Sequence, residues 1–472
     1  MTTLIKGGTT VSDGLSQRCD VLIDGEKIVA IEPAANGEGS SQAGETAFTD
    51  YTINTTVDAT GCYVLPGIID SHVHFRDPGL TAKGDFDSES RAAAAGGVTS
   101  VFDMPNTKPQ TTTMEAFEEK RHTAAERCHV NYACFFGATA DNTELFGQLD
   151  RSRVPGIKLF MGSSTGNMLV DDDATLERIF REAHRLGLPL VAHCEDTAMI
   201  NAAMDELCQT LGTDDPPVEF HPVIRSREAC YESLSKALSL AIETQARLHV
   251  AHVSTEEELT MFAPFTSTIT AEACVGYLMF SLTDYRRLGS RIKVNPSIKD
   301  FRDQWALRQG LTDGHVATVA TDHAPHLLPE KQGGCRKAVS GMPMVQFSLV
   351  TMLELVDEGV LTIERLVQLM AHNPARLFGL SERGHLQPGM KADIVVVKPD
   401  TPWTLTADQV ESRCGWSPLE GHTFRWKVMK TLCNGHLVYD SVTPICGNSH
   451  VDTDYHGEEL TFCHDDDYHL QS

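Results

Sequence analysis

Two histidines placed two residues apart give the clearest chemical signal in the first part of the chain. They are His72 and His74, in the segment 70–79 that reads DSHVHFRDPG. Side chains two apart on a β-strand point to the same face, so both imidazoles can reach one metal ion. A His-x-His pair alone is explained as well by structural histidines. Its place at the end of an apolar run gives more weight to a metal site.

Three further residues with metal-binding side chains stand at the ends of apolar runs. His193 ends the run 189–193, His252 ends 248–252, and Asp322 directly follows 316–321. In a (β/α)8 barrel the carboxyl ends of the strands converge on one face, where residues distant in sequence meet. We therefore expect these side chains to share a site with the first two histidines.

Lys158 is the single cation in the buried-looking strand 156–160. Keeping a bare ammonium charged there is costly, so one interpretation is a lysine that pairs with a carboxylate or reaches solvent. The other is a neutral amine that has reacted with carbon dioxide. The resulting carbamate is an anion with two oxygens, which can bridge two metal ions.

The elements that must position these residues alternate between strands and helices. Helix-compatible runs, such as 173–186 and 228–245, lie between most of the strands. Eight strands in this alternation predict an α/β fold of the (β/α)8 barrel type, with a doubly wound open sheet as the competitor. The predicted strands are 63–75, 98–104, 131–138, 156–161, 189–193, 247–253, 268–274 and 315–321.

The two ends of the chain have a different pattern. Short β-type runs at 21–23 and 27–31 flank an Asp-Gly turn, and similar runs recur at 391–397 and 426–439. We expect both ends to combine into one small β-sandwich domain, from residues 1–61 and 384–446, beside a barrel of residues 62–383. The acidic segment 447–472 is expected to be an extended or poorly ordered tail.

Composition excludes several classes of protein. The 472 residues are 41% hydrophobic, carry a formal charge of −26, and include 13 cysteines without C-x-x-C spacing. A strongly acidic chain without a basic cluster is a poor partner for nucleic acid. No signal peptide or continuous apolar span of membrane length is visible. We expect a cytoplasmic protein with reduced thiols and no membrane association, and homo-oligomers are left open.

Six ordered motifs resemble the dihydroorotase branch of the amidohydrolase superfamily. The resemblance runs from about residue 64 to 389, and the flanking strands resemble the small β domain of that family. The motifs are DSHVHFRDPG at 70–79, DMPNT at 103–107, KLFMG at 158–162, HCED at 193–196, AHVS at 251–254 and ATDHAPH at 320–326.

This resemblance implies two divalent metal ions. Zinc is favoured, because nitrogen and oxygen ligands with an open position suit catalytic zinc, although manganese or cobalt could occupy such a site. Asp322 would be a ligand of one ion and also the catalytic proton carrier. A carbamate on Lys158 would bridge the two ions. The implied ligands are His72, His74 and Asp322 for one ion and His193 and His252 for the other.

The resemblance also implies a substrate and the residues that bind it. The substrate would be dihydroorotate, interconverted with N-carbamoyl-aspartate, bound by Arg76, Asn106 and Asn295 with His326 assisting. A hydantoinase, dihydropyrimidinase or allantoinase could use the same metal centre. Their substrates lack the dihydroorotate carboxylate, so Arg76 and Asn106 are the discriminating residues.

One segment departs from the family pattern. After Glu272 many relatives carry a histidine pair, whereas this chain reads ACVGY at 273–277. Those histidines are not expected ligands, so the departure bears on loop shape.

A catalytically inert barrel acting as an assembly partner is the alternative from another class. It predicts a damaged ligand set, but all six implied ligands are present.

Overall fold

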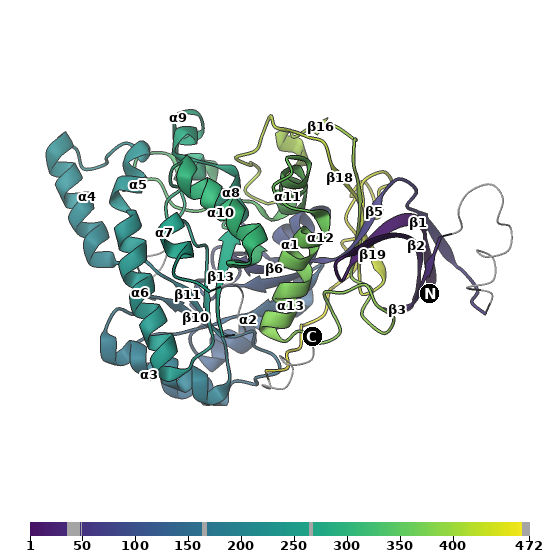
Figure 1. Cartoon of the computed structure of the whole chain (residues 1–472), viewed down its shortest axis with the longest axis horizontal. Helices are drawn as coiled ribbons and strands as arrows, with labels where there is room; N and C mark the ends of the chain where they lie inside the picture. Colours follow the sequence, from purple (N-terminus) through teal and green to yellow (C-terminus); the bar gives the residue numbers. More distant parts are fainter. Residues whose placement is uncertain (35–47, 49, 163–167, 264–267, 465–472) are drawn as a thin grey trace.

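Eight parallel strands form the barrel of the computed structural model, which describes residues 1–34, 48, 50–162, 168–263 and 268–464 (Figure 1). Each barrel strand pairs with the barrel strand that follows it in the chain. The barrel strands are β6 (Ile68–Val73), β7 (Val98–Asp103), β8 (Asn131–Cys134) continued by β9 (Phe136–Gly137), β10 (Ile157–Phe160), β11 (Leu190–His193), β12 (Leu248–Val250), β13 (Ile269–Cys274) and β14 (Val316–Ala320).

Contacts between the last and first strands close the sheet. Val73 forms a parallel bridge with His323 just beyond β14, and the backbone N–H of His74 donates to the carbonyl of His323 at 2.7 Å. The Thr321 hydroxyl donates to Asp70 Oδ2 at 2.6 Å. The (β/α)8 prediction is therefore confirmed, and the open-sheet alternative is excluded.

The predicted strand 63–75 is divided in the structure. Its first part, β5 (Tyr63–Pro66), belongs to the β domain, and β6 begins after Gly67. A Cβ at Gly67 would lie 2.1 Å from Thr99 Oγ1, so a larger residue cannot occupy this crossing point. The hydrophobic pattern is continuous across the division, which is why periodicity did not show it.

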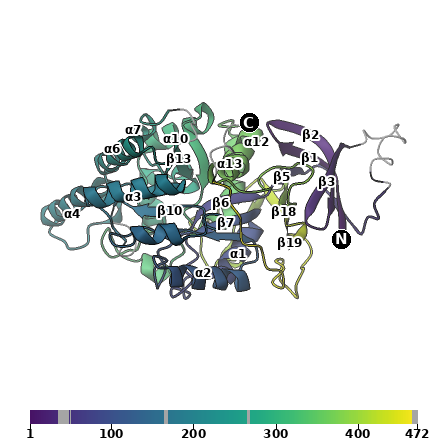
Figure 2. The same ribbon diagram turned by 90° about the horizontal axis from the view of Figure 1, so that it is seen from below.

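Helices cover the outside of the barrel (Figures 1 and 2). The predicted helix 173–186 coincides with α3, which begins after Asp172, whose carboxylate accepts from Thr175 N, and ends at the left-handed Gly187. The prediction 228–245 is shifted by one residue from α6. The helices are α1 (Phe86–Ala95), α2 (Met114–Arg127), α3 (Asp173–Leu186), α4 (Thr197–Leu211), α5 (His221–Ile224), α6 (Arg227–Thr244), α7 (Glu256–Leu259), α8 (Val275–Met279), α9 (Tyr285–Leu288), α10 (Phe301–Asp313), α11 (Ser348–Asp357), α12 (Ile363–Val367) and α13 (Asn373–Phe378).

Both chain ends build the β domain, as predicted. Its sheet has the order β19-β18-β15-β5-β1-β2-β3, with β4 also beside β1, and apolar side chains such as Ile5, Val21 and Ile394 form its core. Because β5 pairs with β1 and β15, we propose that the barrel begins near Gly67; the divisions at 383 and 446 stay predictions. The strands are β1 (Thr2–Ser12), β2 (Leu15–Asp24), β3 (Lys27–Pro33), β4 (Thr55–Asp58), β5, β15 (Ile394–Lys398), β18 (Lys427–Cys433) and β19 (His436–Asp440), with a separate pair β16 (Trp403–Thr404) and β17 (Thr423–Phe424).

The C-terminal segment is packed against the barrel up to residue 464. Glu459 bridges to Tyr132, Leu460 N donates to Tyr132 O at 2.8 Å, and Phe462 packs edge-on against Phe102. His464 is buried, with Nε2 2.9 Å from Val154 O. Of the two forms expected for this segment, extended or poorly ordered, the part up to residue 464 has the extended one, and residues 465–472 lie outside the described residues.

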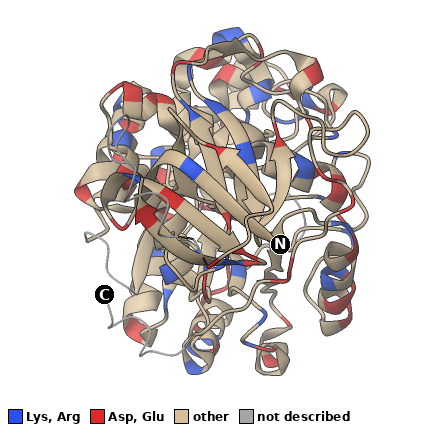
Figure 3. Ribbon diagram, turned by 90° about the vertical axis from the view of Figure 1, so that its right-hand side faces the viewer, with Lys and Arg blue, Asp and Glu red and all other residues tan. Residues whose placement is uncertain are grey.

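Charged residues of both signs lie on the helices around the barrel. In the view of Figure 3, Asp and Glu positions are mixed with Lys and Arg positions along these helices. Among the described residues, no helix combines the length and apolarity needed to cross a membrane.

Candidate metal centre

Three of the predicted ligands meet where the barrel closes. Asp322 Oδ1 lies 2.9 Å from His74 Nε2 and 3.4 Å from His72 Nε2. Both histidines are at the carboxyl end of β6, and Asp322 follows β14, so strand pairing brings them together. Their ligand atoms all lie within 4.8 Å of one another. This geometry can hold one ion.

His193 and His252 form a second set on the adjoining strands. His193 Nδ1 faces His252 Nε2 at 3.0 Å, and the His252 ring lies 5.4 Å from that of His72. His193 Nε2 lies 3.0 Å from Glu195 Oε2, which also pairs with Arg225. Burial lowers the pKa of both imidazoles, so they are neutral, as metal ligands must be.

Lys158 is buried between these groups. Among the described residues its amine Nζ has no hydrogen-bond or ion-pair partner, and it lies 5.0 Å from the centre of the Phe160 ring. Burial lowers its pKa, against the opposing effect of Glu272 and Asp322. The interpretation of a lysine paired with a carboxylate finds no support here. A buried polar atom without a partner fits a group that is completed by a further ligand.

Glu272 is a residue of the site that the sequence reasoning did not assign. Its Oε1 accepts from His72 Nδ1 at 2.7 Å and from His252 N at 3.1 Å, and the side chain is fully buried on β13. The first contact fixes the tautomer of His72 and leaves Nε2 for a metal. A lone acidic residue within an apolar strand was the signal that could have identified it.

Three of the eight non-glycine residues with positive φ among the described residues lie at the site. Arg76, His252 and Asp322 have φ values of 70°, 40° and 49°, in the left-handed region that residues with a Cβ rarely adopt. Such strain persists only where the surroundings enforce it, and it clusters at functional sites. All three residues lie just beyond strand ends.

The predicted substrate residues line a small cavity beside the ligands. It measures about 30 Å³, and its lining includes His74, Arg76, Asn106, Asn295 and Asp322. His74 Nδ1 donates to Asn106 Oδ1 at 2.6 Å, which leaves His74 Nε2 directed at Asp322. The structure thus brings together residues from three of the six motifs and from the segment of Asn295.

The predicted assistant, His326, contacts Arg76 rather than the cavity. Arg76 is 2% exposed; its Nε donates to Pro325 O at 3.1 Å, and one terminal nitrogen lies 3.0 Å from His326 Nε2. Burial lowers the pKa of Arg76 to about 10 and that of His326 well below its ordinary value, so the imidazole is neutral and Arg76 keeps its charge.

Comparison with known proteins agrees with this geometry. The model of the amidohydrolase family matches residues 63–438. The chain belongs to this family. This amidohydrolase is 36% identical over 428 residues to the dihydroorotase of Halobacterium salinarum, covering 90% of this chain and 94% of that protein. It is 32% identical over 455 residues to the allantoinase of Rubrobacter xylanophilus, covering 94% and 95%.

A solved structure gives the same fold. The L-hydantoinase (dihydropyrimidinase) of Arthrobacter aurescens superposes on the amidohydrolase with a TM-score of 0.87 at 28% identity, covering 97% of this chain and 99% of that one. Proteins named for different cyclic amides are thus similar to this chain over nearly its whole length.

The segment that departs from the family pattern has a structural role in this amidohydrolase. Residues 275–279 form α8, and the Tyr277 hydroxyl donates to Pro296 O at 2.8 Å. Tyr277 therefore supports the loop that carries Asn295 into the cavity.

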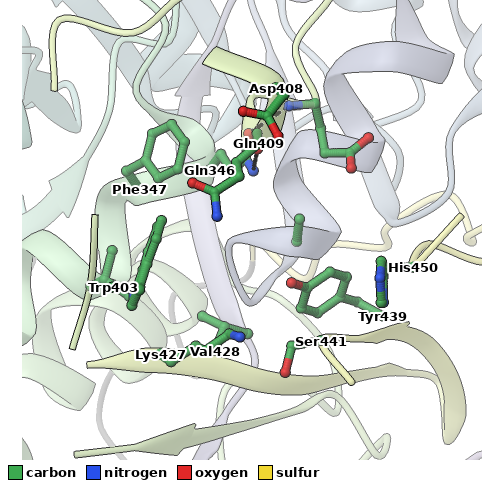
Figure 4. A pocket seen from close by; sticks show the side chains of 13 residues that line it. Gln346, Phe347, Trp403, Asp408, Gln409, Lys427, Val428, Tyr439, Ser441 and His450 are labelled. Atoms are coloured by element: carbon green, nitrogen blue, oxygen red, sulfur yellow. Dashed lines mark hydrogen bonds between the residues drawn. The ribbon is translucent and has the colours of Figure 1, made fainter. Parts of the chain in front are cut away.

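A larger cavity lies elsewhere in the amidohydrolase. It measures about 370 Å³ and is lined by side chains that include Phe347, Trp403, Lys427, Tyr439 and His450 (Figure 4). None of the three potential ligand groups found among the described residues lines it. The smaller cavity, in contrast, is lined by His74 and Asp322 of the ligand group described above.

Proposed function

We propose that this amidohydrolase is a cytoplasmic dihydroorotase of de novo pyrimidine biosynthesis. It would reversibly hydrolyse the cyclic amide of dihydroorotate to N-carbamoyl-aspartate. Dihydroorotases from Halobacterium salinarum and Geobacter metallireducens, 36% and 33% identical to this chain, support the assignment. The surroundings of Arg76 are the observation that favours dihydroorotate as the substrate.

Arg76 is a buried cation that lines the cavity, and its hydrogen bonds among the described residues are to the Pro325 carbonyl and the His326 imidazole, not to a carboxylate. Burying an unpaired charge is costly, so the site favours a ligand that brings an anion. Dihydroorotate carries a carboxylate, which a guanidinium can bind through two parallel hydrogen bonds. Hydantoin, dihydrouracil and allantoin have no such group.

The donor set fits two divalent ions, for which zinc is the favoured metal. We propose that Lys158 is present as a carbamate, which would account for its buried, unpartnered nitrogen. Bound ions would polarise the amide carbonyl and lower the pKa of water. The proposed ligands are His72, His74 and Asp322 for one ion, His193 and His252 for the other, and the Lys158 carbamate for both.

Asp322 is proposed to carry the proton. Burial alone would raise its pKa, but the imidazoles of His72 and His74 hold it below its ordinary value, so the carboxylate stays ionised. It can accept a proton from the attacking water and deliver it to the departing ring nitrogen. Arg76, Asn106 and Asn295 would hold the substrate while this transfer takes place. In the reverse direction the same carboxylate takes the proton from the nitrogen that closes the ring.

Allantoinase is the second candidate, because the Rubrobacter xylanophilus allantoinase is 32% identical over nearly the whole chain. Steady-state kinetics with dihydroorotate, hydantoin, dihydrouracil and allantoin separates the candidates. We expect dihydroorotate to be preferred and Arg76→Ala to lower its kcat/KM by at least about tenfold, since a charge-assisted hydrogen bond contributes roughly 1.5–3 kcal/mol. Arg76→Lys should also be impaired, because lysine cannot form the planar two-point contact.

The matched control is Arg181→Ala, which removes an exposed arginine from an ion pair on α3 and should change neither rate nor preference. Equal or greater efficiency on a ring without a carboxylate would assign the chain to the allantoinase or hydantoinase branch.

A further inference from the structure

A second group of potential metal ligands lies at the junction of the β domain and the barrel. This junction cluster consists of Asp13, His372 and His385. Asp13 is in the turn between β1 and β2, His372 ends the π-helical turn Gln368–His372 before α13, and His385 is in the loop between α13 and β15. The barrel helix α12 also contacts β1, so the cluster lies where the two parts of the fold meet (Figure 2).

The side chains of the junction cluster converge. One ligand atom from each lies within 4.8 Å of the other two. His385 Nδ1 is 2.7 Å from Asp13 Oδ1, and the imidazole rings of His372 and His385 are stacked with centroids 4.3 Å apart and planes 2° apart. Because an imidazole binds a metal in the plane of its ring, the His385 ring must rotate out of the stack to share an ion with His372. Two imidazoles and a carboxylate are a ligand set that zinc binds, with water completing four-coordination.

The surroundings prepare these groups for a metal. His372 is buried, and its Nε2 lies 3.5 Å from the Ser12 hydroxyl oxygen. Asp13 Oδ2 accepts from the Gln387 amide at 3.0 Å and the Ser12 hydroxyl at 2.9 Å, contacts that orient the carboxylate. Asp13 and Gly14 form the two-residue turn of the β1–β2 hairpin, with φ of 51° and 77°.

We propose that Asp13, His372 and His385 bind one zinc ion per chain, independently of the catalytic centre and of its substrate. Tetrahedral zinc places its ligand atoms about 3.4 Å apart, so the 2.7 Å contact between Asp13 and His385 must open on binding. Asp13 is exposed and His385 partly exposed, both in loops, whereas His372 is buried. The two loop residues can therefore move towards the fixed one.

Zinc at this position would join the β1–β2 turn to the segments on both sides of α13. The contact would connect residues far apart in sequence, through two loops that otherwise meet by hydrogen bonds. A metal that binds only the folded state stabilises it, so the ion would act as a structural link between the β domain and the barrel.

The test is the zinc content of the metal-loaded protein after equilibrium dialysis against micromolar free zinc, together with catalytic activity. We compare wild type with His385→Ala and Asp13→Asn, both at accessible positions. The matched control is His436→Ala, which removes the histidine of another partly exposed His–Asp pair, with Asp452 at 2.8 Å.

We expect wild type and His436→Ala to hold one zinc ion more per chain than His385→Ala and Asp13→Asn, with activity equal in all four proteins. An anomalous zinc peak between the three side chains should be present in wild-type crystals and absent in the variants. Equal zinc content in wild type and both variants would overturn the proposal. The cluster would then be an ion pair of Asp13 and His385, with the His385 ring stacked on His372. A loss of zinc accompanied by a loss of activity would also contradict it, because the ion would then belong to the catalytic centre.

Discussion

Replacing Glu272 by glutamine tests whether the buried charge of Glu272 orients the proposed metal ligands. Its carboxylate accepts from His72 Nδ1 at 2.7 Å and from His252 N at 3.1 Å, so it contacts one ligand residue of each proposed ion. Glutamine keeps the length and one acceptor oxygen but removes the charge. A hydrogen bond to a charged group contributes about 1.5–3 kcal/mol and a neutral one about 0.5–1.5 kcal/mol.

The difference, roughly 1–1.5 kcal/mol, predicts about tenfold weaker zinc binding by Glu272→Gln. This agrees with the roughly 10–100-fold effects of residues that orient metal ligands. We expect kcat/KM to fall at limiting zinc and to recover in part at saturating zinc. Competition with a chromogenic chelator gives the affinity, and initial rates over a zinc series give the recovery.

The control for this experiment is Glu354→Gln, which alters a Glu–His pair with His422 outside the site. It should leave zinc affinity unchanged. If Glu272→Gln binds zinc and turns over substrate like wild type, the charge of Glu272 does not orient His72, and the tautomer must be fixed in another way.

Three further predictions concern the site and the loop beside it. We expect two metal ions per wild-type chain by elemental analysis, with Lys158→Ala losing most activity and short carboxylic acids partly restoring it; a bare amine in electron density of active, metal-loaded enzyme would contradict the carbamate. Asp322→Asn should bind substrate but turn over very slowly, because an amide accepts no proton; near-normal turnover in a metal-replete variant would exclude Asp322 as the carrier. Lys120 Nζ lies 2.5 Å from Asp103 Oδ2, and both side chains are fully buried. Lys120→Met removes this ion pair and should lower the free energy of unfolding by roughly 3–5 kcal/mol. Urea titration checks this last value. A decrease in the free energy of unfolding of less than about 1 kcal/mol would show that this ion pair contributes little to the stability of the region.

The sequence predicted the strands of the barrel better than their closure. Apolar runs separated by amphipathic helices are local properties, and α3 could be predicted to the residue because Asp172 and Gly187 mark its ends. Whether the sheet closes depends on pairing between Val73 and His323, which no local pattern encodes. The same limit explains the tail, where the burial of Leu460 and Phe462 depends on a partner surface from β7, β8 and α13.

The candidate site was predictable where position and residue type coincide. His193 and His252 stand at strand ends, so a barrel directs them to one face. Glu272 lies inside β13, and a single acidic residue in a strand is compatible with many roles. Its importance follows from two contacts to other strands, which only the folded structure supplies.

The strained residues connect the fold to the chemistry. Arg76, His252 and Asp322 each have a left-handed backbone just beyond a strand, a conformation that costs on the order of 1–3 kcal/mol for a residue with a Cβ. Glycine would relieve the strain but would remove the guanidinium, the imidazole or the carboxylate. The strain must therefore be held by the surrounding structure, and His323 is the central contact. Its carbonyl accepts from His74 N at 2.7 Å, while its ring Nε2 lies 2.8 Å from Glu89 Oε2 and its Nδ1 accepts from Met344 N at 3.1 Å. These contacts tie the residue after Asp322 to β6, α1 and the loop before α11. Barrel closure thus enforces the backbone geometry that turns Asp322 towards His72 and His74.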